Sequence, residues 1–447
     1  MSSEWCDTTI GQVCARVYSG GTPTSTNLSY YGGDIPWLRT KEVNYRKIYT
    51  TEERITQLGH ENSAAKLVPA NSVIVAMYGN GDTAGRVAIN KVPLTTNQAC
   101  CNLVVDPNVA DYRFVYYFLQ SKYQALVDLK NGGAQQNLNG QLIKAFPLSI
   151  PSLSEQAAIA DLLEALDDRI TLLRETNATL EAIAQALFKS WFVDFDPVRA
   201  KRDGRAPEGM DEATAALFPD SFENSELGEV PRGWSIGSIA SLMRLHKGTV
   251  NPAESPEKWF QHFSLPAYDD GQSPALQQGT EIKSNKTSVP ERAVLLSKLN
   301  PHIPRVWLPS TVSTDAVCST EFLVFVPSEV TTTNFVYSLL NASDFCVRLC
   351  QLVTGTSNSH QRVKPDSVLC LPQVIPAPEC IRAYDLVVEG LYERLKLNRE
   401  AYLKLADLRD TLLPRLISGQ LRLPRGAGAG CRGPRCLNRG ERHESRL

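Results

Sequence analysis

Residues 153–195 decide the fold, and they read LSEQAAIADLLEALDDRITLLRETNATLEAIAQALFKSWFVDF. The stretch contains neither proline nor glycine. Ser152 or Ser154 can cap its start, and Glu155 places a negative charge in the first turn. The sequence therefore predicts one continuous helix of about 40 residues, roughly 60 Å long.

Apolar residues recur along this helix in alternating steps of four and three, the pattern of a coiled-coil seam rather than of a broad apolar face. Asn177 falls on the seam, where a buried polar residue costs stability but fixes register and partner. The residues that we expect in the interface of this helix are Leu166, Ile170, Leu173, Asn177, Leu180 and Leu187.

A second stretch, residues 386–420, repeats the pattern as LVVEGLYERLKLNREAYLKLADLRDTLLPRLISGQ. Placing Leu166 over Leu391 aligns the two stretches without a gap and matches arginines, a glutamate and leucines. The alternative is a pair of unrelated helices that share a leucine heptad, which these matches disfavour. The expected interface of the second helix is Leu391, Leu395, Asn398, Tyr402, Leu405 and Leu412.

The segments before the two helices also correspond, so the chain reads as a tandem repeat. Residues 334–337 (NFVY) echo residues 113–116 (RFVY), and both copies are mixed segments of strands and helices. In the first copy we expect strands at 72–78, 97–105 and 145–150 and a helix at 113–129. The predicted divisions are a first domain at 1–151, a long helix at 152–195, a linker at 196–230, a second domain at 231–376, a second long helix at 377–421 and a disordered tail at 422–447.

Composition is that of an ordinary globular protein, with 447 residues, 21% charged and 43% hydrophobic. A net charge of −2 excludes a global basic field, so nucleic-acid contacts would need local patches. No signal peptide and no apolar run of membrane-spanning length are visible, which predicts a cytoplasmic protein without a membrane partner. The 11 cysteines include no CxxC pair and the six histidines are scattered, so we expect reduced thiols and no metal site.

The catalytic motifs for which we searched are missing. The chain has no phosphate-binding GxxxxGK[ST] loop, no GxSxG nucleophile elbow and no amino-methyltransferase motif. Gly79, Gly81 and Gly85 follow a predicted strand, but their spacing does not fit a dinucleotide site and another strand follows. The sequence therefore predicts no catalytic residue on this chain.

Polar loops in both copies carry the residue types that read DNA. Asn and Gln pair with adenine, Arg and Lys with guanine, and Lys, Ser and Thr suit phosphate oxygens. Any single one is an ordinary solvated loop residue, so the inference depends on their clustering in both copies. The candidates are Arg39, Lys41, Asn44, Tyr78, Asn80, Thr83, Arg86, Gln135, Gln136, Asn137 and Lys144 in the first copy, and Lys283, Lys286, Lys298, Asn300, His302, Arg305, Ser357, Asn358, His360, Gln361, Arg362 and Lys364 in the second.

The chain resembles the specificity subunit of type I restriction–modification systems. The resemblance covers about residues 5–421, apart from the missing Glu-Gln start of the second long helix. It is carried by residues 33–39 (GDIPWLR), 151–160 (PSLSEQAAIA), 166–170 (LDDRI), 184–195 (AQALFKSWFVDF), 319–324 (STEFLV) and 412–419 (LLPRLISG).

The resemblance implies an α/β (α+β) fold with two target-recognition domains, each reading one half of a split double-stranded DNA site. Two long antiparallel coiled-coil helices would separate the domains by a fixed distance, in a pseudo-twofold arrangement. Two methyltransferase subunits and motor–nuclease subunits would be its partners. S-adenosylmethionine, ATP and magnesium would belong to those subunits, and this chain would hold no cofactor.

Two alternatives stay open from the residues alone. The first is a coiled-coil scaffold without DNA specificity, which would show no steeply salt-dependent DNA binding. The second is a self-contained methyltransferase–recognition fusion, which methyl transfer by the isolated chain would reveal. The base sequence recognised, the spacer length and the methylated base cannot be read from the residues.

Overall fold

The computed structural model describes residues 5–79, 83–129, 138–353 and 361–424. The chain forms two compact units, one of Met1–Asp168 with Ala406–Leu447 and one of Arg169–Leu405. The predicted α+β class with two long helices is confirmed. The tail predicted to be disordered lies, from residue 425 on, outside the described residues.

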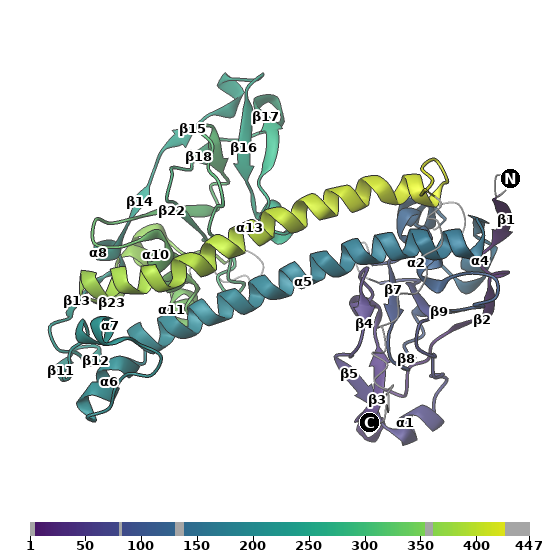
Figure 1. The fold of residues 1–447 in the computed structure, drawn as a ribbon, viewed down its shortest axis with the longest axis horizontal. Helices are drawn as coiled ribbons and strands as arrows, with labels where there is room; N and C mark the ends of the chain where they lie inside the picture. The colour runs from purple at the N-terminus through teal and green to yellow at the C-terminus, as the bar shows by residue number, and fades with distance from the viewer. Residues whose placement is uncertain (1–4, 80–82, 130–137, 354–360, 425–447) are drawn as a thin grey trace, which may run out of the picture. The chain divides into compact units, whose positions relative to one another are not determined.

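The two long helices, α5 (Leu153–Phe192) and α13 (Pro378–Ile417), each contain 40 residues (Figure 1). Each bound of α13 lies 225 positions after that of α5. The Ser152 hydroxyl accepts a hydrogen bond from the Glu155 backbone at 3.4 Å and so caps α5. The helix stops three residues earlier than predicted, and Phe195 takes a left-handed conformation with φ 57°.

The first copy consists of two main sheets and short helices, shown in purple and blue in Figure 1. The five-stranded sheet has the order β2 (Cys14–Ser19), β9 (Cys100–Val105), β6 (Val73–Ala76), β7 (Val87–Asn90) and β4 (Lys47–Ile48). The three-stranded sheet has the order β5 (Glu53–Ile55), β3 (Tyr31–Leu38) and β8 (Thr95–Thr96). The other elements are the strand pair β1 (Cys6–Thr9) and β10 (Pro147–Ile150), and the helices η1 (Leu28–Tyr30), η2 (Thr40–Glu42), α1 (Gln57–Glu61), α2 (Tyr112–Ser121), α3 (Tyr123–Asp128) and α4 (Gly140–Ala145).

Strand β6 shows why this copy folds as it does. All four of its residues are buried, as expected for a central strand covered on both faces. Val73 and Val75 pack in the cluster that contains Phe114 of α2, whereas Ile74 packs on the opposite side with Leu38 of β3. The apolar residues of β6 therefore pack into two hydrophobic clusters, one on each face of the sheet.

The second copy repeats this plan. Its four-stranded sheet has the order β14 (Met243–His246), β22 (Phe322–Pro327), β19 (Val294–Ser297) and β20 (Val306–Trp307). Its five-stranded sheet has the order β15 (Thr249–Val250), β18 (Lys286–Ser288), β21 (Ala316–Cys318), β16 (Trp259–Phe263) and β17 (Ala275–Gln278). The other elements are the strand pair β13 (Ser235–Ser238) and β23 (Pro372–Ile375), and the helices α8 (Ile239–Leu242), η3 (Pro252–Glu254), α9 (Leu265–Asp269), η4 (Gly279–Glu281), α10 (Thr333–Asn341), α11 (Ser343–Gln351) and α12 (Pro365–Leu369).

Strand order and register match between the copies. The order β2-β9-β6-β7 corresponds to β14-β22-β19-β20, and the order β5-β3-β8 corresponds to β17-β16-β21. In both copies the pairing of the last two strands is parallel, β3 with β8 and β16 with β21. The second copy lacks, among its described residues, an edge strand in the place of β4.

Two expectations about local structure are corrected. The stretch 196–230, expected as a linker from its prolines and glycines, forms α6 (Asp196–Arg202), α7 (Glu212–Ala216) and the hairpin of β11 (Phe222–Ser225) and β12 (Gly228–Pro231). Its Val198 and Phe218 are buried in the core of the second unit. The helix expected at 113–129 is broken at Lys122, where φ −105° and ψ 18° interrupt the helical path and start α3.

Candidate nucleic-acid interface

In each copy the loop that follows a fully buried strand, β6 or β19, carries candidate DNA-reading residues. Directly after β6, Met77 N–H donates to Ala99 O at 2.8 Å, and after β19, Lys298 N–H donates to Glu321 O at 2.9 Å. These equivalent bonds fix the start of the two loops. Arg86 and Arg305 close the loops, because their carbonyls accept from the last residue of the preceding strand at 2.9 Å in both copies.

The two closing arginines have different partners. Arg86 Nη1 donates to Asn44 Oδ1 at 2.9 Å, so the structure brings these two candidates together. Arg305 forms a two-pronged pair with Asp269, at 2.7 Å from Nε and 2.9 Å from Nη2. Hydrogen bonding to Asp269 raises the pKa of Arg305, which keeps this guanidinium charged.

Two other charged candidates of the first copy, Arg39 and Lys41, are exposed and paired. Arg39 forms an ion pair with Glu53, and Lys41 forms one with Glu52. Arg39 is the N-cap residue of the short helix η2, and Lys41 lies within that helix, which ends shortly before Asn44. Among the remaining candidates, Tyr78, Thr83 and Lys144 are half-buried, and Asn80, Gln135, Gln136 and Asn137 lie outside the described residues.

The second copy gathers its candidates on a short antiparallel bridge. Asn300 N–H donates to Gln361 O at 2.8 Å, and Val363 N–H donates to Lys298 O at 3.0 Å. Arg362 lies on this bridge and forms two bonds of 3.1 Å with Glu321, which raise its pKa. Lys298, Asn300, Gln361 and Arg362 therefore form one cluster.

Asn300 differs from its neighbours in this cluster. Its backbone is left-handed, with φ 51°, which an asparagine tolerates better than most residues. Its buried Oδ1 accepts no hydrogen bond from the part of the chain that the structure describes. A ligand donor, such as an exocyclic base amine, would satisfy this acceptor.

Several second-copy candidates do not join this cluster. Lys286 lies in β18, is 8% exposed and donates to the Ser284 hydroxyl at 2.7 Å. Burial lowers the pKa of Lys286, so this side chain fits a structural position better than a phosphate contact. Lys283, His302 and Lys364 are exposed, and Ser357, Asn358 and His360 lie outside the described residues.

The coiled-coil candidates lie where the two long helices face each other. In the second unit, Asn398 Nδ2 donates to Asn177 Oδ1 and Asn177 Nδ2 donates to Leu395 O, both at 3.0 Å. Tyr384 bonds to Ala184 O at 3.1 Å, which makes the packing of these helix segments antiparallel. Ile170, Leu173, Leu395, Asn398 and Tyr402 are buried, and Leu166, Asn177, Leu180, Leu187, Leu391, Leu405 and Leu412 are half-buried.

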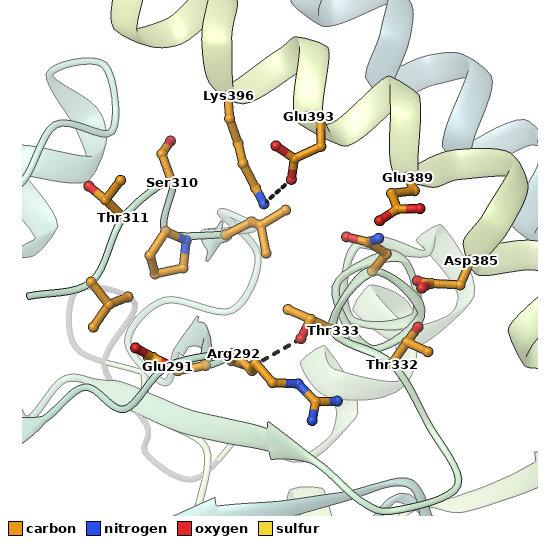
Figure 2. A pocket seen from close by; sticks show the side chains of 15 residues that line it. Glu291, Arg292, Ser310, Thr311, Thr332, Thr333, Asp385, Glu389, Glu393 and Lys396 are labelled. Atoms are coloured by element: carbon orange, nitrogen blue, oxygen red, sulfur yellow. Dashed lines mark hydrogen bonds and ion pairs between the residues drawn. The ribbon is translucent and has the colours of Figure 1, made fainter.

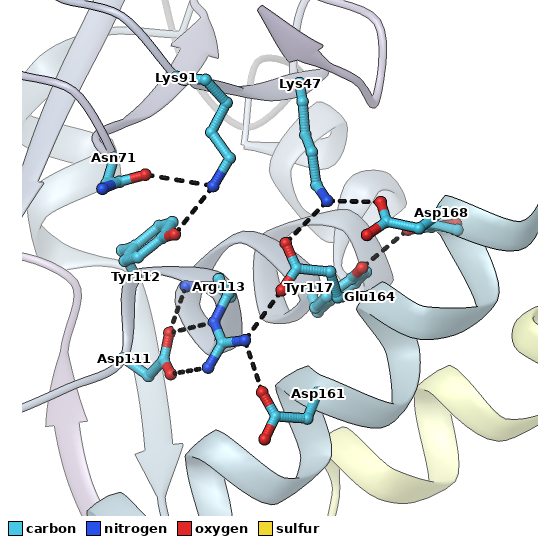
Figure 3. A network of polar contacts seen from close by, with 11 residues as sticks. Lys47, Asn71, Lys91, Asp111, Tyr112, Arg113, Tyr117, Asp161, Glu164 and Asp168 are labelled. Carbon is cyan, nitrogen blue, oxygen red and sulfur yellow. Dashed lines mark hydrogen bonds and ion pairs between the residues drawn. The ribbon is translucent and has the colours of Figure 1, made fainter. Parts of the chain in front are cut away.

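Sequence reasoning missed a polar network that fastens the first copy to α5 (Figure 3). Arg113 of α2 contacts Asp161 at 2.6 Å and Glu164 at 2.8 Å, and it also pairs with Asp111 at 2.7 Å. Lys47 of β4 reaches Glu164 at 2.8 Å. A helical sequence does not show which face a distant cation will meet, so no pattern in the residues indicates this network.

Gln156 was also missed as a structural residue. It is 1% exposed, and its amide accepts from Asp111 N–H at 2.9 Å while it donates to Pro151 O at 2.9 Å. It therefore ties the start of α5 to the start of α2. The only signal in the sequence was its place in the Pro-x-Leu-x-Glu-Gln run.

The network predicts a pH dependence of stability. Burial alone would raise the pKa of Glu164, but hydrogen bonds from Lys47 and Arg113 lower it below its ordinary value. A carboxyl with a lowered pKa stabilises the fold above its unfolded pKa of about 4.3, and this contribution is lost as the pH falls through the folded pKa. Glu164→Gln should therefore lower the free energy of unfolding by about 1 kcal/mol at pH 7, and by less below pH about 4.

Chemical unfolding at several pH values, followed by fluorescence, measures this difference. Glu175→Gln, an exposed substitution on the same helix, serves as the control and should have little effect at any pH. If Glu164→Gln lowered the free energy of unfolding by the same amount down to pH 3, this would contradict a lowered pKa of Glu164 in the folded protein.

The described residues contain no group of three His, Cys, Asp or Glu side chains that could hold a metal ion. None of the described helices is long and apolar enough to cross a membrane.

Comparisons with known proteins bear on both copies. The family described as "Type I restriction modification DNA specificity domain" matches residues 2–182. The chain is 25% identical over 428 residues to the type I restriction enzyme MjaIX specificity subunit of Methanocaldococcus jannaschii, covering 91% of each chain. It is 26% identical to the HindI specificity subunit of Haemophilus influenzae, covering 71% of this chain and 80% of that one.

A solved structure has a similar fold. The S subunit of a type I restriction–modification system from M. genitalium superposes with a TM-score of 0.56 at 16% identity, covering 93% of this chain and 96% of that chain.

Proposed function

This chain is a relative of the type I restriction-enzyme specificity subunits, and from this premise we propose that each of its two copies reads one half of a split DNA site. Its role in the assembly is DNA sequence specificity. The catalytic activities of such systems lie in other subunits, so this chain is a non-catalytic component.

The observation that carries the proposal is the tandem architecture. Two copies with the same strand order end in helices of 40 residues each, so the scaffold is repeated. The loops on this scaffold differ: Arg86 pairs with an amide in one copy, and Arg305 pairs with a carboxylate in the other. One scaffold with two sets of polar loops fits one task performed on two different base sequences.

The charged candidates would act by exchanging partners. Arg39 and Arg362 now form ion pairs with Glu53 and Glu321, and both are exposed. Exposed pairs contribute little to stability, at about 0–1 kcal/mol, so a DNA phosphate or a guanine edge can compete for the guanidinium. These carboxylates would also repel DNA that does not offer a strong contact.

The long helices would set the unread spacer between the two half-sites. The Asn177–Asn398 pair holds the helix segments of the second unit in one register, because any slip would leave two amides without partners. A fixed register gives the pair of helices a fixed length. Two methyltransferase subunits and the motor–nuclease subunits would dock on this scaffold, and S-adenosylmethionine, ATP and magnesium would bind to them. The complex would act in the cytoplasm, on host and incoming DNA.

The second candidate function is a coiled-coil scaffold without DNA specificity. Salt dependence of DNA binding separates the two functions. With about six to ten phosphate contacts, the dissociation constant should rise by about 10³- to 10⁵-fold between 50 and 200 mM salt. Titrating a fluorescent duplex with the chain, or with its methyltransferase complex, at several salt concentrations gives the slope. Binding too weak to detect at 50 mM salt would favour the scaffold.

A further inference from the structure

The two copies are fastened to the long helices by different kinds of contact, and each junction lies within one compact unit. In the first copy, cations of the domain meet carboxylates of α5 (Figure 3). Arg113 contacts Asp161 at 2.6 Å and Glu164 at 2.8 Å. Lys47 contacts the same Glu164 at 2.8 Å and Asp168 at 2.5 Å. The side chains of Arg113, Glu164 and Lys47 are 19%, 20% and 22% exposed, so water and dissolved ions reach this junction.

Helix α13 joins the first junction through charge as well. Arg409 of α13 pairs with Asp167 of α5 at 2.8 Å, and this carboxylate also accepts from the Tyr117 hydroxyl of α2 at 2.8 Å. Aliphatic side chains of the two helices, such as Leu163 and Leu413, complete the contact with the core of the first copy. Opposite charges therefore contribute to the first junction at both helices.

The second copy lacks these charges at the equivalent positions. The NFVY run of α10 matches the RFVY run of α2, so Asn334 stands where the first copy has Arg113. Strand β4, which carries Lys47, has no counterpart among the described strands of the second copy. Each bound of α13 lies 225 positions after that of α5, so Tyr392 stands where α5 has Asp167. Within the described chain, no ion pair joins the second domain to either long helix.

The acids that remain on α13 do not replace the missing ion pairs. Glu389 and Glu393 stand at the positions of the two α5 acids that contact Lys47, and both line a cavity of about 530 Å³ (Figure 2). Glu393 pairs with Lys396 of its own helix at 2.8 Å. Arg292 of the second domain also lines the cavity, but it forms no ion pair with any described residue. The second domain is therefore attached in another way.

Aromatic rings and neutral hydroxyls attach the second domain. The ring of Phe335 in α10 lies 5.4 Å from that of Phe188 in α5, measured between centroids. The Ser338 hydroxyl of α10 lies within hydrogen-bond distance of the Tyr384 and Tyr392 hydroxyls of α13, at 2.8 and 2.7 Å. All five side chains are buried. Salt does not screen the burial of rings or hydrogen bonds between neutral groups as it screens opposite charges.

The charged groups at the second junction also meet neutral partners. Glu181 of α5 accepts a hydrogen bond from the buried hydroxyl of Tyr337, whose pKa is raised by burial. Arg399 of α13 donates to Leu308 O of the second domain at 3.4 Å. These contacts connect a charge with a dipole, and such contacts depend less on ionic strength than pairs of opposite charges do.

We propose that the first junction is an electrostatic latch, formed by Arg113, Lys47 and their α5 carboxylates. When salt screens the latch, the first domain detaches from its helices while the domain itself stays folded. The second domain stays attached under the same conditions, because buried rings and neutral hydroxyls hold it. The first domain is then the one that can change its angle on the helices. The proposal concerns how the domains are attached and not what their loops read.

Thiol labelling at two equivalent buried positions of the full-length chain tests the proposal. Leu163 lies in the first junction and Val388, 225 positions later, in the second, and both are 0% exposed. Each is replaced by cysteine in a separate variant, and peptide mass spectrometry follows the reaction of every cysteine with N-ethylmaleimide. A buried thiol reacts only when its surroundings open, so its labelling rate reports the population of the open state.

We expect salt to open one junction only. From about 0.1 M to about 1 M NaCl the screening length falls from about 10 to about 3 Å, so Leu163→Cys should be labelled about tenfold faster. Labelling of Val388→Cys, and of native Cys100 and Cys318, should change by less than about twofold. Both native thiols are buried in clusters that contain no residue of α5 or α13. They therefore report the unfolding of a domain and not its detachment.

Two lysine variants, each combined with Leu163→Cys, locate the charges. Lys47→Met keeps a long side chain but removes one cation of the latch. It should speed labelling in the low-salt buffer about fivefold and reduce the further effect of salt. Lys91→Met is the matched control, because Lys91 donates to Asn71 and Tyr112 and not to a carboxylate (Figure 3). It should leave the labelling rate and its salt response unchanged.

Three results would overturn the proposal. An equal salt response of Leu163→Cys and Val388→Cys would show that the two junctions do not differ. If Cys100 were labelled faster together with Leu163→Cys, salt would be unfolding the first domain and not detaching it. An unchanged salt response after Lys47→Met would place the salt-sensitive charges outside the latch. None of these results bears on whether the chain reads a split DNA site, which DNA-binding and methylation experiments decide separately.

Discussion

Inserting seven residues into each long helix should lengthen the unread DNA spacer by about three base pairs and leave both half-sites unchanged. The insertions follow Leu173 in α5 and Tyr402 in α13, which are adjacent across the helix pair because Arg174 stacks on the Tyr402 ring at 5.0 Å. Seven residues keep the heptad in phase and add about 10 Å of helix, the length of about three base pairs. Sequencing of modified bases in host DNA measures the new spacer.

The control is the insertion in α5 alone. It would leave the length of α13 unchanged and move Asn177 out of reach of Asn398, so the half-buried amide of Asn177 and the buried amide of Asn398 would lose each other as partners. We expect this variant to be destabilised and poor at modification, not to acquire a new spacer. An unchanged spacer in the doubly extended chain would reject the role of the helices as a ruler.

Replacing Gln135, Gln136 and Asn137 by alanines should remove recognition of one half-site and preserve the other. The three residues lie outside the described residues. Helix α4 follows them, and Asn139 caps this helix by accepting a hydrogen bond from Gln141 N–H at 2.9 Å. Each lost base contact costs about 1–3 kcal/mol of discrimination, so losing two or three should reduce preference for that half about 10³-fold.

Competition binding with duplexes altered in one half or the other measures this effect. The matched control is the second-copy variant Ser357→Ala with Asn358→Ala, which should relax the opposite half. Loss of both halves from either change would contradict two independently reading domains.

The long helices were the most predictable part of the fold. The length of α5 follows from a run without proline or glycine, whereas α13 continues through Gly390 and Pro414. The seam asparagines, Asn177 and Asn398, stood out against leucines. The structure brings these two amides into contact at 3.0 Å. Repetition was also visible, because buried strands and aromatic helix starts recur in both copies.

Long-range charge pairing was not predictable. Arg39, Arg305 and Arg362 were selected as candidate DNA contacts, and in the structure each pairs with a carboxylate that the sequence did not indicate. The linker prediction failed because Pro and Gly content does not reveal that Val198 and Phe218 will be buried by distant elements. Pairing and burial are decided by the tertiary fold, which local patterns do not encode.

The measurement that tests the central claim most directly is methylation mapping. The chain would be expressed with the methyltransferase subunits proposed as its partners, in a host that lacks them, and modified bases in the host DNA would be located by sequencing. The account predicts one split motif with two defined halves around a fixed spacer. A competent, assembled complex that modifies no sequence, or only a continuous motif, would contradict it.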